Sequence, residues 1–212
     1  MTYRVKEIFP TLQGEGARTG RAAVFLRFSG CNLWDGKEES RQSAACRFCD
    51  TDFVSTNGDH GGEYESPDTL ADAVANLWRG TSGTPCVVIT GGEPTLQLDP
   101  ALIEALHARG FDIALETNGT REVPQGVDWI CVSPKAGTRW IQKTGQELKL
   151  VWPQEFDLTE LASLPFENFF LQPMDDPDPV RNAENIREAV RICLEHPVWR
   201  LSLQTHKLIG IP

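Results

Sequence analysis

Apolar residues gather in short runs along the chain, and a polar or glycine-rich segment follows each run. The runs at 22–30 and 86–90 are almost wholly apolar, which is typical of parallel strands that are buried on both faces. The runs that predict strands cover 22–30, 86–90, 111–117, 128–133, 148–152, 169–173 and 199–205.

Three other segments repeat their apolar residues with helical spacing. These predicted helices cover 66–80, 99–110 and 178–196. Pro67 and Pro100 stand near the start of the first two, where proline is well tolerated because its missing N–H would be unpaired anyway. In the longest helix, the spacing predicts that Ile186, Val190 and Cys193 face inward.

Alternating strands and helices predict an α/β fold. A complete eight-fold barrel needs about 250 residues, and this chain has 212 residues with about three convincing helices. We therefore expect a single domain over 1–212, folded as a partial, open (β/α) barrel of about six parallel strands. In such folds the chemistry lies at the carboxyl ends of the strands, and the polar motifs of this chain stand there.

The charge and composition narrow the class of protein. Lys plus Arg number 20 and Asp plus Glu 30, for a net charge of −10, which argues against a nucleic-acid ligand. The start, MTYRVKEIF, does not resemble a signal peptide, and no apolar run is long enough to span a membrane. We therefore expect a cytoplasmic protein, whose cysteines stay reduced in that compartment.

Six cysteines divide into two groups. Cys86, Cys131 and Cys193 sit within apolar strand or helix patterns and are expected to be plain buried thiols. The other three lie in one polar loop after the first strand, which favours ligation: Cys31, Cys46 and Cys49.

Two kinds of centre could use these three thiols. Zinc prefers four ligands, and His60 is the only further candidate nearby, so a zinc-stabilised binding module is the weaker interpretation. A 4Fe–4S cluster held by three thiolates leaves one iron without a protein ligand, where a small molecule can bind.

Together with these cysteines, six further motifs carry a resemblance to a known family. They are FPTLQGEG (9–16), TGGEP (90–94), ETNG (116–119), SPK (133–135), QPMD (172–175) and LQTHKLIGIP (203–212). With the CDT at 49–51, they resemble the radical S-adenosylmethionine superfamily and, within it, the 7-carboxy-7-deazaguanine synthases. The chain departs from the superfamily pattern C-x-x-x-C-x-x-C, because residues 32–45 form an expanded cluster-binding loop.

The resemblance implies a role for each matching residue. Cys31, Cys46 and Cys49 would bind the 4Fe–4S cluster, and the amino and carboxylate groups of S-adenosylmethionine would chelate the fourth iron. Glu116 and Asn118 are weaker candidates for the cofactor pocket. The residues implied to contact S-adenosylmethionine are Phe48, Asp50, Gly92, Ser133, Pro134, Lys135, Gln172, Pro173, Met174 and Asp175.

The implied substrate is 6-carboxy-5,6,7,8-tetrahydropterin. A radical would remove hydrogen at C6, the ring would contract, ammonia would leave and the cofactor would be regenerated. Thr51 would help to hold Mg²⁺, which needs few protein ligands. The candidate substrate-binding residues are Leu12, Gln13, Gly14, Glu15, Arg27, Thr90 and Pro212.

Arg27 also stands out on physical grounds, because it lies between apolar residues where an unpaired charge would be costly. The apolar tail that ends at Pro212 is expected to fold back into the site, with His206 orienting it. We further expect a flavodoxin or ferredoxin-type electron donor and a homodimer. The nearest alternative enzyme is a glycyl-radical activating enzyme, which shares the cofactors but acts on a protein.

Overall fold

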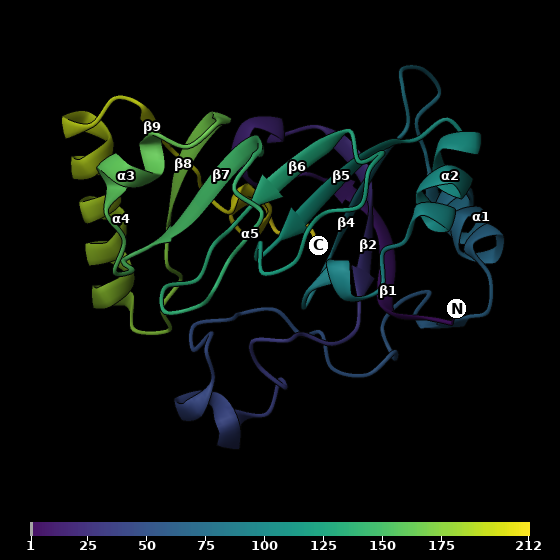
Figure 1. Ribbon diagram of the computed structural model, residues 1–212, viewed down its shortest axis with the longest axis horizontal. Coiled ribbons are helices and arrows are strands. Elements are labelled where there is room, and N and C mark those ends of the chain that lie inside the picture. The colour runs from purple at the N-terminus through teal and green to yellow at the C-terminus, as the bar shows by residue number, and fades with distance from the viewer. Residues whose placement is uncertain (1) are drawn as a thin grey trace.

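The computed structural model describes residues 2–212. Over these residues, one sheet contains nine strands in the order β3-β1-β2-β4-β5-β6-β7-β8-β9 (Figure 1). The strands are β1 (Tyr3–Leu12), β2 (Ala22–Phe28), β3 (Gly62–Tyr64), β4 (Cys86–Gly91), β5 (Asp112–Thr117), β6 (Trp129–Val132), β7 (Gly145–Trp152), β8 (Phe166–Pro173) and β9 (Trp199–Leu201). From β2 to β9 every neighbouring pair is parallel, whereas β1 pairs antiparallel with β2 and β3.

The helices cover the two ends of the sheet and leave its middle open (Figure 1). They are α1 (Pro67–Leu77), α2 (Pro100–Ala108), α3 (Leu158–Ala162), α4 (Pro179–Glu195) and α5 (Thr205–Ile209), with short 3₁₀ turns η1 (Gly16–Arg18), η2 (Glu38–Ser43) and η3 (Pro94–Leu96). Within the described chain, no helix follows β5 or β6. The α/β fold with an open, largely parallel sheet is therefore confirmed, with seven parallel strands over residues 2–212.

Alternation along the strands divides the side chains between two environments. In β2, Leu26 and Phe28 are fully buried in the hydrophobic core beneath α1 and α2. In β7, Leu148 and Leu150 pack likewise in a second core beneath α3 and α4. The residues between them point to the other face of the sheet, so this face receives the polar side chains of the strands.

The segment 13–21 crosses the inner side of the curved sheet and connects its two halves. The amide of Gly16 donates to Ser202 Oγ (2.9 Å), and the amide of Ala17 donates to Glu147 Oε2 (3.1 Å). Arg18 forms an ion pair with Asp112 at the start of β5 (2.7 Å). These contacts fix the floor on which a site at the carboxyl ends of the strands can form.

Three expectations need correction. Ile186 and Val190 are 39% and 38% exposed, because α4 instead turns Ala189 and Ile192 toward the sheet. The last strand ends at Leu201, where the chain leaves the sheet edge and soon enters α5. The strand β1 was not predicted, since its apolar residues are interrupted by charges and by a proline.

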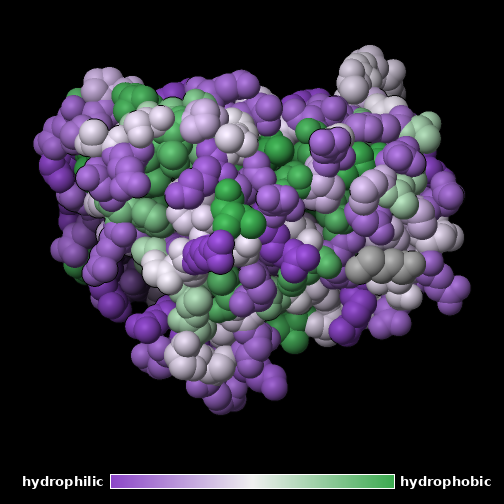
Figure 2. All heavy atoms as spheres, viewed as in Figure 1, coloured by the Kyte–Doolittle hydropathy of each residue, from purple (hydrophilic) through white to green (hydrophobic). Residues whose placement is uncertain are grey.

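The surface is mainly hydrophilic on the face seen in Figure 2, where apolar residues are scattered between charged ones. Among the helices of residues 2–212, none has the length and apolar character that crossing a membrane requires.

Candidate active site

A cavity of about 430 Å³ lies where the polar motifs meet at the carboxyl ends of the strands. It is lined by every candidate residue of the sequence analysis except Pro134, and by Glu116, Asn118 and His206. The carbonyl of Pro134 instead accepts a hydrogen bond from Gln154 Nε2 (3.4 Å). Motifs as far apart in the sequence as 9–16 and 203–212 thus contribute to one chamber.

Three free thiols face this cavity. Cys46 is buried, and Cys31 and Cys49 are partly exposed. The hydrogen bond from the Cys46 thiol lowers the pKa of Cys49 to about 6, against the opposing effect of burial. Desolvation by burial raises the pKa of Cys31. One of the three thiols is therefore already poised to be a thiolate, the form that binds iron.

The backbone beside Cys31 is packed so closely that position 92 has no room for a side chain. A Cβ added to Gly92 would lie 2.3 Å from the carbonyl oxygen of Gly30 and 2.7 Å from Cys31 Cβ. Glycine is therefore required for this close approach of two loops next to a thiol. A cradle of bare backbone beside three thiols fits a cluster with one open iron and a small ligand bound to it.

Glu93 explains why TGGEP and ETNG meet. Its carboxylate is fully buried and accepts from the Thr95 amide (3.0 Å), Thr117 Oγ1 (2.8 Å) and the Asn118 amide (2.8 Å). Asn118 Nδ2 in turn donates to Asn32 Oδ1 in the cysteine loop (3.1 Å). A buried carboxylate with several donors thus ties the ends of β4 and β5 together and attaches the cysteine loop to them.

Two carboxylates of the proposed cofactor pocket share one cation. Lys207 Nζ donates to Asp50 Oδ2 (2.8 Å) and to Asp175 Oδ2 (2.7 Å). Burial opposes the ionisation of Asp50, but Lys207 outweighs this effect, and the pKa of Asp50 lies below its usual value. The helix α5 is thereby tied to the cysteine loop and to the end of β8.

Lys135 lies beside the thiols. Its Nζ donates to the Ser133 carbonyl (2.6 Å) and hydroxyl (2.8 Å), and it lies 5.8 Å from the ring centroid of Phe48. Burial lowers the pKa of Lys135, although the charges of Cys46 and Cys49 partly offset this.

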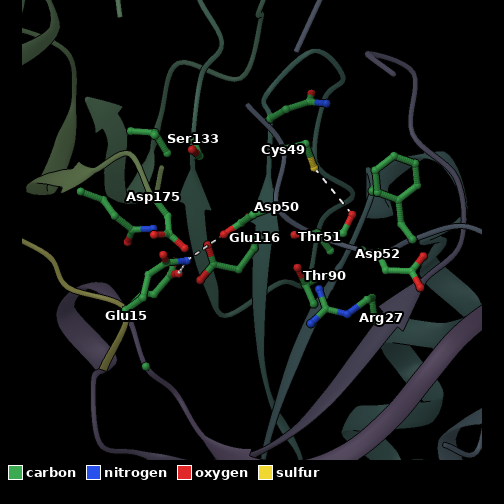
Figure 3. A pocket seen from close by; sticks show the side chains of 18 of the residues that line it. Glu15, Arg27, Cys49, Asp50, Thr51, Asp52, Thr90, Glu116, Ser133 and Asp175 are labelled. Carbon is green, nitrogen blue, oxygen red and sulfur yellow. Dashed lines mark hydrogen bonds between the residues drawn. The ribbon is translucent and has the colours of Figure 1, made fainter. Parts of the chain in front are cut away.

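Arg27 lies on the opposite wall, where β2 pairs with β4. Thr90 is its direct neighbour in the sheet, and Figure 3 shows the two side chains together, with Thr51 close by. Arg27 Nε donates to Glu7 Oε1 (2.7 Å). Because Glu7 engages the Nε edge of the guanidinium, the terminal nitrogens are left to face the cavity.

Lys149 forms a buried ionic group with two carboxylates. Its Nζ donates to Glu15 Oε2 (2.6 Å) and Glu116 Oε2 (2.8 Å), and its side chain is 5% exposed. Gln13 Nε2 donates to the other oxygen of Glu116 (3.2 Å). Burial would disfavour these charges, but the pairing lowers the pKa of Glu15 and raises that of Lys149 well above its usual value. The cavity thus presents the carboxyl groups of Glu15 and Glu116, both held by one ammonium group.

The C-terminal tail lies over the same chamber. Thr205 donates from its amide and its hydroxyl to the Gly14 carbonyl (3.0 and 2.9 Å). His206 packs against Gly14 so closely that an added Cβ there would lie 2.1 Å from its Nδ1. Thr11 Oγ1 donates to the oxygen of Pro212 (2.7 Å). The tail therefore reaches the cavity, and His206 lies within it.

Among the residues that line the cavity, Lys149, Gln204 and Lys207 were given no role in the sequence analysis. Lys149 could have been predicted from the sequence, because it lies in the apolar run LKLVW. An unpaired charge would be costly there, as was argued for Arg27. Gln204 and Lys207 lie in the tail motif at 203–212, which was expected to fold back into the site, but their partners depend on how the tail folds. Gln204 Nε2 donates to Glu15 Oε1 (3.1 Å) and Asp50 Oδ2 (3.3 Å).

A single metal ion has no ready set of protein ligands. Within residues 2–212, no group of three or more His, Cys, Asp or Glu side chains is arranged to hold one. Thr51 faces the cavity, and its carbonyl lies 3.9 Å from Cys49 Sγ.

Comparison with known families defines the class of protein. The family model of the radical SAM superfamily matches residues 43–143, which include Cys46, Cys49 and the TGGEP motif. This chain belongs to that superfamily, whose members use a 4Fe–4S cluster and S-adenosylmethionine. Membership favours the cluster over the zinc-stabilised binding module as the explanation of the three thiols.

Full-length relatives define the family more closely. A 7-carboxy-7-deazaguanine synthase of Caulobacter vibrioides is 62% identical, and one of Bradyrhizobium diazoefficiens is 58% identical, each over 100% of both chains. The crystal structure of QueE from Escherichia coli superposes with a TM-score of 0.65 at 28% identity, covering 96% of this chain and 94% of that one. Within the radical SAM superfamily, the chain is thus a member of the 7-carboxy-7-deazaguanine synthase family.

Proposed function

We propose that this protein is a 7-carboxy-7-deazaguanine synthase, a carbon–nitrogen lyase that contracts the ring of 6-carboxy-5,6,7,8-tetrahydropterin with loss of ammonia. The observation that carries the proposal is one cavity in which three thiols and a glycine cradle face a guanidinium and two paired carboxylates. Family membership supports the same assignment.

In this proposal Cys31, Cys46 and Cys49 bind the cluster. When bound, the cluster and S-adenosylmethionine supply a 5′-deoxyadenosyl radical. Glycine backbone at Gly92 allows the methionine end of the cofactor to approach closely, since no side chain stands there. The remaining contacts with S-adenosylmethionine come from Phe48, Asp50, Ser133, Pro134, Lys135, Gln172, Pro173, Met174 and Asp175.

The opposite wall binds the pterin. Arg27 offers a fork for the substrate carboxylate, and Thr90 offers a hydroxyl beside it. Glu15 and Glu116 are acceptors that suit the N–H groups of a pterin edge. Leu12, Gln13, Gly14 and Pro212 complete this wall.

Thr51 is proposed to hold Mg²⁺ together with the substrate carboxylate. Mg²⁺ keeps several waters and takes few protein ligands, so one hydroxyl is enough from the protein. In support, Thr51 lies close to Arg27 and Thr90 (Figure 3). Substrate and metal would then depend on each other for binding.

The test is anaerobic reconstitution with iron and sulfide, followed by an assay for 7-carboxy-7-deazaguanine with and without Mg²⁺. We expect about four irons per chain, product only with the carboxylated pterin, and faster turnover with Mg²⁺. A reconstituted protein that cleaves S-adenosylmethionine but leaves this pterin unchanged would refute the assignment and favour an activating enzyme that acts on a protein.

We also propose that a flavodoxin or ferredoxin-type protein reduces the cluster, and that the protein is a homodimer. The stripe Ile186, Val190 and Leu194 supports the dimer, because these residues repeat every four positions on α4 and are 39%, 38% and 77% exposed. Analytical ultracentrifugation of wild type and Leu194→Glu tests this, with a dimer expected only for wild type.

A further inference from the structure

The expanded loop 32–45 is folded around Trp34. The indole is 8% exposed and packs edge-on against Phe53, with ring centroids 5.7 Å apart. Its Nε1 donates to the Lys37 carbonyl and to Ser40 Oγ, both at 3.1 Å. The insertion therefore has a small core of its own, attached to the segment that follows the cysteines.

Arg41 reaches from this insertion back to the C-x-x-C turn. Its Nη1 donates to the carbonyls of Arg47 and Cys49, both at 3.0 Å. Its Nε donates to Glu38 (2.8 and 3.0 Å), and its guanidinium lies 4.0 Å from the ring centroid of Trp34. The Arg41 side chain is thus held by Glu38 and Trp34 while it donates to two carbonyls of the cysteine turn.

The cysteine turn needs such a constraint. Residues 44–53 contain neither helix nor strand, so no ladder of backbone hydrogen bonds sets the direction of the thiols. A planar guanidinium can hold two carbonyls in a fixed relation, and its bonds to them are charge-assisted. It also places a positive charge beside the turn, which favours the more negative, reduced state of any centre bound there.

We propose that Arg41 is a positioning residue for the cluster: it fixes the 47–49 backbone so that Cys46 and Cys49 present their thiols to the cavity. The inference rests on the proposed function, because it assumes that these thiols bind iron. The insertion would thus supply the cysteine turn with a hydrogen-bond donor, Arg41, that a shorter loop would lack.

The test compares three variants that separate the planar guanidinium from its charge. Arg41→Met removes both, and Arg41→Lys keeps the charge but loses the planar group that Glu38 and Trp34 hold in place. Arg47→Met is the matched control, because Arg47 is exposed and stands in the same turn. Unfolding temperatures of the apo-proteins confirm that each variant is folded.

The first readout needs no cluster. Alkylation of apo-protein with iodoacetamide is followed at each cysteine by peptide mass spectrometry. We expect Cys46 to react about tenfold faster in both Arg41 variants, because losing a charge-assisted hydrogen bond raises the open population of the turn by at least that factor. Arg47→Met should match wild type, and Cys131, buried elsewhere, should be unchanged in all variants.

The second readout uses reconstituted protein. The rate of iron loss to a chelator should rise in both Arg41 variants, and the midpoint potential of the cluster should fall in Arg41→Met but not in Arg41→Lys. Equal alkylation rates of Cys46 in wild type and Arg41→Met would overturn the inference. A wild-type protein that takes up no iron would instead refute the proposed function, so the two failures are distinguishable.

Discussion

Replacing Lys149 by methionine removes the ammonium group between Glu15 and Glu116 and leaves a side chain of similar length. In the wild-type protein this ammonium donates to both carboxylates, within a site where its side chain is 5% exposed. The variant therefore leaves two partly buried carboxylates, 17% and 21% exposed, close together without a cation, which makes it costly for both to stay charged.

The expected loss is large for one residue. Breaking a buried ion pair by removing one partner costs about 3–5 kcal/mol. For a chain of this size, about 1 kcal/mol lowers the unfolding temperature by roughly 2–4 °C, so the decrease should be about 6–20 °C. A domain is stable by about 5–15 kcal/mol in total, so the variant should still fold.

The loss should depend on pH, and the pKa shifts give its sign. The pKa of Glu15 is lowered, so its contribution is present above its unfolded value of 4.5 and is lost as the pH falls through the folded value. The pKa of Lys149 is raised, so its contribution is complete below 10.5 and is lost at higher pH. In the variant, burial without the cation raises the carboxyl pKa, so the destabilisation should be larger at pH 8 than at pH 5.5.

Urea unfolding of wild type and Lys149→Met at both pH values measures this difference. The control is Lys143→Met, which removes the same charge from an exposed position and should change stability by less than about 0.5 kcal/mol. Adding Glu116→Gln to Lys149→Met should recover stability at pH 8, because one of the two opposed carboxylates is then gone. A loss below about 1 kcal/mol that is the same at both pH values would refute the reasoning.

Four further outcomes are expected. Gly92→Ala should fold yet take up less than half the wild-type iron on reconstitution, because its Cβ would collide with the Gly30 carbonyl oxygen. Thr51→Ala should keep its iron but lose the stimulation of turnover by Mg²⁺, and equal stimulation would contradict the proposed metal site. Lys207→Met should make α5 more sensitive to limited proteolysis, because the helix loses its ties to two aspartates. A glycine appended after Pro212 should cut turnover sharply, and wild-type turnover would show that the tail does not contact the substrate.

Much of this fold follows from local chemistry. The runs that became β4 and β5 are apolar because both faces of a central parallel strand are buried. At the start of α1, Ser66 accepts a hydrogen bond from the Thr69 amide, and Pro67 occupies the first helical position. The face of α4 that packs against the sheet could not be predicted from the sequence. That helix carries two apolar stripes, and only the tertiary structure decides that Ile192 rather than Val190 is buried.

The site, like the fold, has parts that the sequence predicted and parts that it did not. Residues such as Cys46 and Gly92 were expected at the cavity because their motifs carry a chemical meaning of their own. Gln204 and Lys207 also lie in a motif, but their contacts with Glu15 and Asp50 could not be predicted, because these contacts bridge more than 150 positions and no local pattern encodes them. The prediction of the site from the sequence was therefore limited by the separation of contacting residues along the chain.

The carbonyl of Leu33 accepts hydrogen bonds from the amides of Ala45 and Cys46 (3.1 and 3.3 Å), so the excursion between them is closed at its base. Because the base is closed, a change in length between Leu33 and Ala45 keeps Cys31 and Cys46 at the same spacing, and the entropy of closing a loop rises slowly with its length. This part of the chain can therefore accept a grafted peptide or a fluorescent label, provided that the replacement retains a cation able to reach the carbonyl of Cys49.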